Sequence, residues 1–169
     1  AGSTFCAAVQ NNDMVAAYAN DNWSQPNLQP AREDLDLSLQ NVTVDTFVKN
    51  LQENITTDSL DFDIQVLKGD SSGLGKKDFK HDVNIIFYDG DNSEHKMREF
   101  FINMIDFTED VFTLVVDDAN IEENVAITKR FIDAMGFKVL FERELLNDPE
   151  DLDMWWNGLY VVVLSKSTL

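Results

Sequence analysis

The sequence predicts an α/β fold built on a doubly wound, mostly parallel sheet with helices on both faces. Short apolar segments alternate with helix-patterned segments of about 10–15 residues, as they do in βαβ units. Acidic residues directly follow several of the apolar segments, at the edge where ligands bind in a parallel sheet. The length of 169 residues and the hydrophobic content of 44% suit a single domain over residues 1–169.

The first half of the chain contains two expected helices and two expected strands. Val44, Phe47, Val48 and Leu51 have the spacing of one helical face. A segment with two prolines follows the first strand and indicates a loop. We therefore expect helices at residues 3–11 and 42–54, and strands at residues 14–19 and 63–67.

The second half shows the alternation more clearly. Met97, Phe100, Phe101 and Met104 form one apolar helical face, and Gly136 stands where a helix commonly ends in a left-handed glycine. We expect strands at residues 83–88, 111–116, 137–141 and 159–164, and helices at residues 94–106 and 121–135.

The charge of the chain restricts its partners. It has 31 acidic and 13 basic residues, a formal net charge of −18. Such a surface repels nucleic acid and anionic membranes, so neither is expected as a partner. The single cysteine, Cys6, cannot form an internal disulfide, and no apolar run approaches the roughly 20 residues of a membrane span. No signal-peptide pattern is present, so we expect a cytoplasmic protein.

Carboxylates end two successive strands, in FYDGDNSEH (residues 87–95) and FTLVVDDAN (residues 112–120). Asp89 and Asp91 follow the first strand, and Asp117 and Asp118 follow the second. Neighbouring carboxylates repel one another unless a cation, or donors of a ligand, lie between them. Mg²⁺ prefers oxygen ligands, so Asp89, Asp117 and Asp118 form a candidate metal site. Alternatively, each acid caps the helix that follows it.

His95 is a candidate general base, although its position in the helix at residues 94–106 also suits an exposed surface residue. The chain contains no Ser-His-Asp order, CxxC pair or HExxH motif, and GLGKK (residues 73–77) lacks the full phosphate-loop pattern. The candidate catalytic residues are therefore Asp89, Asp91 and His95.

Five motifs, in this order, are similar to those of the class I S-adenosylmethionine-dependent methyltransferases: GSTFCAA, DNWS, IIFYDGDNSEH, FTLVVDDAN and WWNGLYVVVLSK. Over nearly its whole length the chain resembles a branch of small bacterial and phage members. The resemblance implies a Rossmann-like, seven-stranded sheet whose last strand is antiparallel. Because the chain starts at AGST, we expect the first strand and the E-x-G part of the donor-binding motif to be missing.

The same resemblance implies that S-adenosylmethionine is the methyl donor. Gly2 would be the last glycine of the donor-binding loop, Asp21 would accept hydrogen bonds from the ribose hydroxyls, and Asp70 would lie near the adenine. The residues expected to bind the donor are Gly2, Ser3, Asp21, Asn22, Trp23, Asp70 and Ser71.

Metal-dependent O-methyltransferases of this superfamily hold Mg²⁺ with an aspartate after the fourth strand and an acidic pair after the fifth. Asp89, Asp117 and Asp118 match these positions. By resemblance, the metal would orient a hydroxyl of a small-molecule acceptor and lower its pKa for in-line attack on the methyl group. The relatives usually carry histidine where this chain has Asn92, which cannot take a proton.

Two alternatives remain open at this point. The missing first strand and Asn92 favour a methyltransferase fold that has lost catalysis and acts as a binding or structural module. The run IIFYDGD also resembles haloacid-dehalogenase-like phosphatases, with Asp89 as nucleophile and Asp91 as acid. The 27 residues between Asp89 and Asp117 leave room for only a single helix, and this short spacing argues against the phosphatase interpretation.

Overall fold

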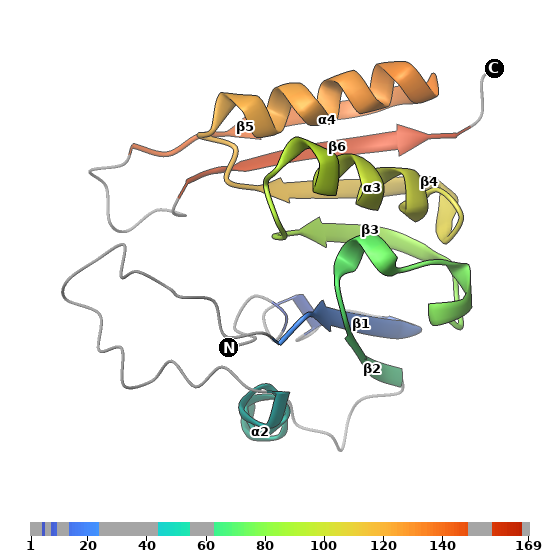
Figure 1. Cartoon of the computed structure of the whole chain (residues 1–169), viewed down its shortest axis with the longest axis vertical. Coiled ribbons are helices and arrows are strands. Elements are labelled where there is room, and N and C mark those ends of the chain that lie inside the picture. Colours follow the sequence, from blue (N-terminus) through green and yellow to red (C-terminus); the bar gives the residue numbers. More distant parts are fainter. Residues whose placement is uncertain are drawn as a thin grey trace. The chain divides into compact units, whose positions relative to one another are not determined.

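The computed structural model describes Phe5, Ala8, Val9 and residues 14–23, 44–54, 63–148 and 157–166. Its contacts divide the chain into two compact units, Ala1–Asp70 and Ser71–Leu169 (Figure 1), which we take in turn. Organisation as a single domain stays a prediction. Within the described ranges, no helix combines the length and the apolar character needed to cross a membrane.

The first unit is built around two parallel strands. β1 (Ala16–Asp21) pairs with β2 (Asp63–Lys68), and α2 (Val44–Asn54) lies between them in sequence. In the segment predicted as the first helix, Phe5, Ala8 and Val9 are described and helical. The small core consists of Val9, Ala17, Phe5, Met14, Leu51 and Ile64.

The second unit contains a four-stranded sheet in the order β3-β4-β6-β5. β3 and β4 are parallel, whereas β6 is antiparallel to both β4 and β5. β3, β4 and β5 therefore run in one direction, and the last strand of the chain runs against them. This confirms the predicted α/β class, with a mostly parallel sheet and an antiparallel last strand. The elements are η3 (Ser71–Gly73), η4 (Lys76–Asp78), β3 (Val83–Tyr88), α3 (Glu94–Met104), β4 (Thr108–Asp117), α4 (Glu122–Met135), β5 (Lys138–Leu145) and β6 (Leu159–Ser165).

The core of this unit lies between the sheet and its two α-helices. α3 and α4 contact each other and lie on the same face of the sheet (Figure 1). Phe101 of α3 links strand and helix, because its ring centroid is 5.5 Å from Tyr88 and 5.1 Å from Phe131 of α4. Because successive side chains of a strand point to opposite faces, every second residue faces this layer. The fully buried residues of this kind include Leu114, Val116, Val162 and Leu164.

The element boundaries agree with the sequence where apolar periodicity is strong. β3 has the predicted limits, and α4 ends at Met135, directly before Gly136, whose φ of 67° is the left-handed conformation expected of a glycine that follows a helix. β5, in contrast, continues beyond the predicted end at Phe141 as far as Leu145. Every residue of β5 is exposed, and Glu142, Arg143 and Glu144 are charged. The hydrophobic pattern therefore could not predict that the strand continues through these residues.

Candidate functional site

The carboxyl ends of β3 and β4 lie at the same edge of the sheet. The strands are parallel, with Phe87 opposite Val115 and Tyr88 opposite Val116. The loops that follow them therefore begin side by side, as the sequence predicted. We call the residues at this edge, 89–93 and 117–120, the rim.

Asp117 is an acid of the rim with a raised pKa. Partial burial raises the pKa of its carboxyl to about 6, and the nearby charges of Asp89 and Asp118 act in the same direction. The backbone N–H of Asp118 donates to Asp117 Oδ1 over 2.9 Å, which opposes the rise. A carboxyl with a pKa near neutral can both accept and release a proton under physiological conditions.

Asp118 is held between amide side chains from two distant parts of the unit. Its Oδ2 accepts a hydrogen bond from Asn92 Nδ2 (2.7 Å), and its Oδ1 accepts one from Asn157 Nδ2 (2.9 Å). Its carbonyl oxygen accepts from Asn124 Nδ2 (3.3 Å). The backbone has φ = 60°, a left-handed conformation that aspartate tolerates better than most residues. We call Asp118, Asn92 and Asn157 the Asp118 clamp.

A second set of hydrogen bonds supports the clamp from the β6 side. The N–H of Ala119 donates to Gly158 O (3.2 Å), and the N–H of Asn120 donates to Asn157 O (2.6 Å). The Asn120 side chain exchanges two hydrogen bonds with the backbone of Asn147, two residues after the end of β5. Sequence reasoning did not single out Asn120 or Asn157; their only signal was that they stand in the quoted VVDDAN and WWNG motifs.

Asp91 and His95 lie at the beginning of α3. Asp91 Oδ1 accepts the N–H of Ser93 (2.8 Å), and the Tyr88 hydroxyl donates to the carbonyl oxygen of Asp91 (2.8 Å). The hydrogen bonds from Ser93, and to a smaller extent the charge of His95, lower the pKa of Asp91. Asp91 therefore closes a turn just before α3, whose N-cap residue is Ser93, and it makes no capping hydrogen bond to the helix itself.

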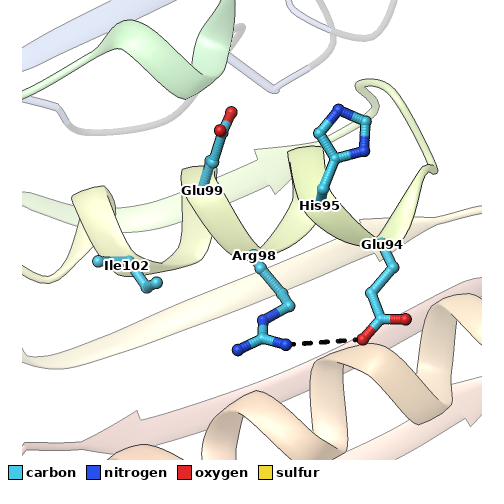
Figure 2. A pocket seen from close by; sticks show the side chains of 5 residues that line it. All are labelled: Glu94, His95, Arg98, Glu99 and Ile102. Carbon is cyan, nitrogen blue, oxygen red and sulfur yellow. Dashed lines mark ion pairs between the residues drawn. The ribbon is translucent and has the colours of Figure 1, made fainter.

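His95 contributes to a surface hollow on α3. The five lining side chains are Glu94, His95, Arg98, Glu99 and Ile102 (Figure 2). His95 and Glu99 point to one side of the helix, whereas Glu94 and Arg98 point to the other and approach each other to 3.8 Å. Among the described residues, only side chains of α3 line this hollow, so the rim remains the better candidate site.

The predicted donor-binding residues are distributed over both units. In the first unit Asp21 Oδ1 accepts the N–H of Trp23 (2.8 Å), and the Trp23 ring lies 5.4 Å from that of Phe47. Trp23 Nε1 is buried, and no described residue accepts its hydrogen bond. Asn22 and Asp70 are exposed.

Ser71 begins η3, in the second unit, and the next residue tethers this turn to α3. Asn103 Nδ2 donates to Ser72 O (2.5 Å), and Lys96 Nζ lies 3.0 Å from Ser72 Oγ. Gly2 and Ser3 lie outside the described residues.

The predicted metal ligands are neighbours but do not form a ligand cage. Over the described part of the chain, no group of three or more His, Cys, Asp or Glu side chains is arranged to hold a metal ion. Both carboxylate oxygens of Asp118 already accept amide hydrogen bonds. The set Asp89, Asp117 and Asp118 therefore does not fit a three-carboxylate site in this conformation.

Comparison with known proteins gives a likeness of structure alone. No protein-family model matches the sequence, and no curated protein matches it. A proposed RNA methyltransferase from Pyrococcus horikoshii is similar at a TM-score of 0.48 and 19% identity, over 74% of this chain and 58% of that one. An rRNA methylase from Streptococcus thermophilus is similar at a TM-score of 0.48 and 13% identity, over 98% of this chain and 93% of that one. The chain thus spans little more than half of the first protein.

Proposed function

We propose that this chain is an S-adenosylmethionine-dependent methyltransferase that acts on a small-molecule acceptor. The observation that carries the proposal is Asp117, a half-buried carboxyl with a raised pKa at the carboxyl edge of a mostly parallel sheet. The reversed last strand and the ordered sequence motifs support the same family. Membership of the small bacterial and phage branch, without its first strand, stays a prediction.

The residues that follow β1 fit part of a methyl donor. S-adenosylmethionine, when bound, supplies an electrophilic methyl group. The exposed Asp21 carboxylate is suited to ribose hydroxyls, and the buried Trp23 Nε1 is a hydrogen-bond donor that has no acceptor among the described residues. Gly2, Ser3, Asn22, Asp70 and Ser71 complete the proposed donor-binding set, on the basis of the sequence resemblance.

In the proposed reaction Asp117 takes the proton from the acceptor group. With a pKa of about 6 it is mostly ionised at neutral pH, yet basic enough to accept a proton from a polarised hydroxyl or amine. Asp89 and Asp118 repel anions, so the acceptor is neutral or cationic. His95, Asp89 and Asp91 remain the other proposed catalytic residues, with His95 as an alternative base.

Magnesium remains a separate proposal. Each carboxylate oxygen of Asp118 already accepts an amide hydrogen bond and has little remaining capacity for a cation, so Mg²⁺ added alone is expected to bind weakly. An acceptor that offers its own oxygen atoms would complete the ligand set. A magnesium titration with and without the acceptor distinguishes these cases.

The first experiment is calorimetric titration with S-adenosylhomocysteine, with and without magnesium chloride, on protein of verified mass. We expect micromolar binding, weakened at least about tenfold by Asp21→Ala because ribose hydrogen bonds to a charged group are lost. Asp133→Ala, at an exposed position of α4, is the matched control and should bind normally. Absence of binding in both buffers contradicts the proposal and favours a module without catalysis.

The second experiment measures transfer of a labelled methyl group to phenols, catechols and amines, and in parallel to ribosomal RNA. We expect transfer to a small molecule and none to RNA, because the net charge of −18 repels a polyanion. Asp117→Asn should lower kcat by about 10²-fold or more if it removes the base. Methylation of RNA alone would replace the proposed acceptor class while leaving the donor assignment intact.

A further inference from the structure

The two asparagines of the Asp118 clamp are followed by small residues that favour deamidation. Asn157 precedes Gly158 and Asn92 precedes Ser93, and no other asparagine of the sequence is followed by glycine or serine. In deamidation the backbone nitrogen of the next residue attacks the side-chain amide, and a glycine there gives the least steric hindrance. Asparagine is accordingly counted among the thermolabile residues of proteins. The chain thus places its most reactive amides around a single carboxylate.

Hydrogen bonds hold the turn at Asn157 and Gly158 in the native state. Asn157 Nδ2 donates to Asp118 Oδ1 (2.9 Å). The carbonyl oxygen of Asn157 accepts the N–H of Asn120 (2.6 Å), and that of Gly158 accepts the N–H of Ala119 (3.2 Å). The first bond fixes the amide that must be attacked, and the other two fix the backbone that must rotate toward it. Reaction at Asn157 therefore requires a local opening of the clamp.

The second clamp asparagine, Asn92, is expected to react more slowly. Its attacking atom would be the backbone nitrogen of Ser93, whose N–H donates to Asp91 Oδ1 over 2.8 Å. Ser93 is also the N-cap of α3, and its carbonyl oxygen accepts the N–H of Met97 (3.0 Å). Because this nitrogen is fixed at the start of a helix, it cannot turn toward Asn92 unless the first helical turn unwinds.

We propose that Asn157 is a deamidation site and that its conversion to aspartate opens the Asp118 clamp. The backbone nitrogen of Gly158 forms a bond to Cγ of Asn157. The Cγ–Nδ2 bond breaks, and the amide leaves as ammonia with the proton of the Gly158 N–H. Water then opens the resulting succinimide ring at either of its carbonyl carbons. The net change is hydrolysis of the amide by water, which gives aspartate or isoaspartate and ammonium.

Both products remove hydrogen bonds from the clamp. An aspartate at position 157 tolerates the left-handed φ of 63°, but it presents a carboxylate to Asp118 where an amide donor had been 2.9 Å away. Like charges at that distance repel each other. Isoaspartate instead lengthens the main chain by one carbon, which displaces the carbonyl oxygens that accept from Ala119 and Asn120. The proposal is independent of the methyltransferase assignment, since it concerns a reaction of the chain with water.

The first test incubates the folded protein at mildly alkaline pH and measures conversion at each asparagine by peptide mass spectrometry. In the wild type we expect Asn157 to convert faster than every other asparagine, but more slowly than in the urea-unfolded chain. Asp118→Ala should speed conversion at Asn157 about tenfold, because a hydrogen bond to a charged group is lost. Gly136→Ala is the control for general destabilisation, since it strains the backbone at a φ of 67° and alters no clamp residue. Its rate should match that of the wild type.

The second test is Asn157→Asp, which reproduces the aspartate product directly. Hydrogen exchange at the N–H groups of Ala119 and Asn120 should become about tenfold faster or more, because both donate to this turn. Asn84→Asp makes the same chemical change at an exposed position of β3 and should leave these exchange rates unchanged.

Each part of the proposal can be contradicted separately. The absence of conversion at Asn157 in the folded wild type, over a time in which the unfolded chain converts, would overturn it. Faster conversion at another asparagine, or a rate in Asp118→Ala no higher than in Gly136→Ala, would do the same. Unchanged hydrogen exchange in Asn157→Asp would show that the clamp stays closed after deamidation, and would overturn the proposed consequence.

Discussion

Asp117 and Asp118 are consecutive residues of one type at the end of β4, yet their surroundings differ completely. Asp117 is partly desolvated, lies near two other carboxylates and has a raised pKa. Asp118 has a left-handed backbone, and amide donors from two separate loops hold both of its carboxylate oxygens. The two members of an acidic pair can thus differ in role: one carboxyl has a pKa shifted toward neutral, while its neighbour bonds the loops around it.

The largest effect expected from breaking this arrangement comes from Gly158→Ala. A Cβ there would lie 2.5 Å from Asn120 Oδ1 and 2.8 Å from Leu145 O, at a φ of 71° that disfavours a side chain. Crowding and backbone strain together should lower the free energy of unfolding by about 3 kcal/mol, measured in urea. The turn that carries Asn157 would move, so the Asp118 clamp would open.

Gly136→Ala is the matched control for Gly158→Ala. It has a similar φ of 67°, but no atom lies within 4 Å of the point that an added Cβ would occupy. We expect a loss of only about 1 kcal/mol, from backbone strain alone. Equal losses in the two variants would show that packing around Gly158 has no special importance.

Asp118→Ala should have the next largest effect. It leaves the amides of Asn92 and Asn157 without their acceptor and places alanine at a left-handed position. We expect a loss of about 2 kcal/mol by denaturant unfolding. The asparagine of Asp118→Asn tolerates the left-handed backbone and keeps one acceptor oxygen, so we expect a smaller loss in the free energy of unfolding, about 1 kcal/mol. If Asp118→Ala is as stable as the wild type, the clamp is not structural.

Local sequence pattern predicted the elements but not the clamp. β3, β4 and both helices of the second unit bury one face, so apolar spacing was enough to place them. The exposed edge strand β5 has no buried face and so shows little apolar spacing, which is why its predicted end at Phe141 is too early. The clamp joins residues 26 and 39 positions apart, a relation that tertiary structure alone creates.

Repulsion between carboxylates predicts a site at the acidic pair Asp117 and Asp118, and Asp117 has the perturbed pKa that this argument implies. Repulsion between strand-end carboxylates pointed to the rim, and Asp117 shows that repulsion in its pKa. The same reasoning placed Asp118 in a metal site, because no local pattern indicates its two asparagine partners. Composition can locate a polar edge, but it does not say which oxygen atoms are already bound.

Asp117→Asn tests the difference between Asp117 and Asp118 further, because its stability relative to the wild type should depend on pH. The folded pKa of Asp117, about 6, is higher than that of an unfolded aspartate, so the folded state binds the proton more tightly. The protonated Asp117 carboxyl therefore contributes its full stabilisation below about pH 4, and this contribution is lost as the pH rises to about 6. Above that range Asp117→Asn should be more stable than the wild type by roughly 1 kcal/mol, a value discounted for solvent screening.

Urea unfolding at several pH values between about 4 and 8 measures this difference. Asp133→Asn, at an exposed site on α4, is the control and should follow the wild type at every pH. A constant difference between Asp117→Asn and the wild type across the range would mean that the Asp117 carboxyl is not perturbed by folding.

The smallest expected effect on stability is that of His95→Ala. His95 is exposed on α3, so the free energy of unfolding should change by less than about 0.5 kcal/mol. Its effect on methyl transfer decides between the two proposed bases. If Asp117 takes the proton, kcat should fall less than about threefold in His95→Ala, against about 10²-fold in Asp117→Asn. The reverse order would assign the base to His95 and leave Asp117, like Asp118, with a structural role.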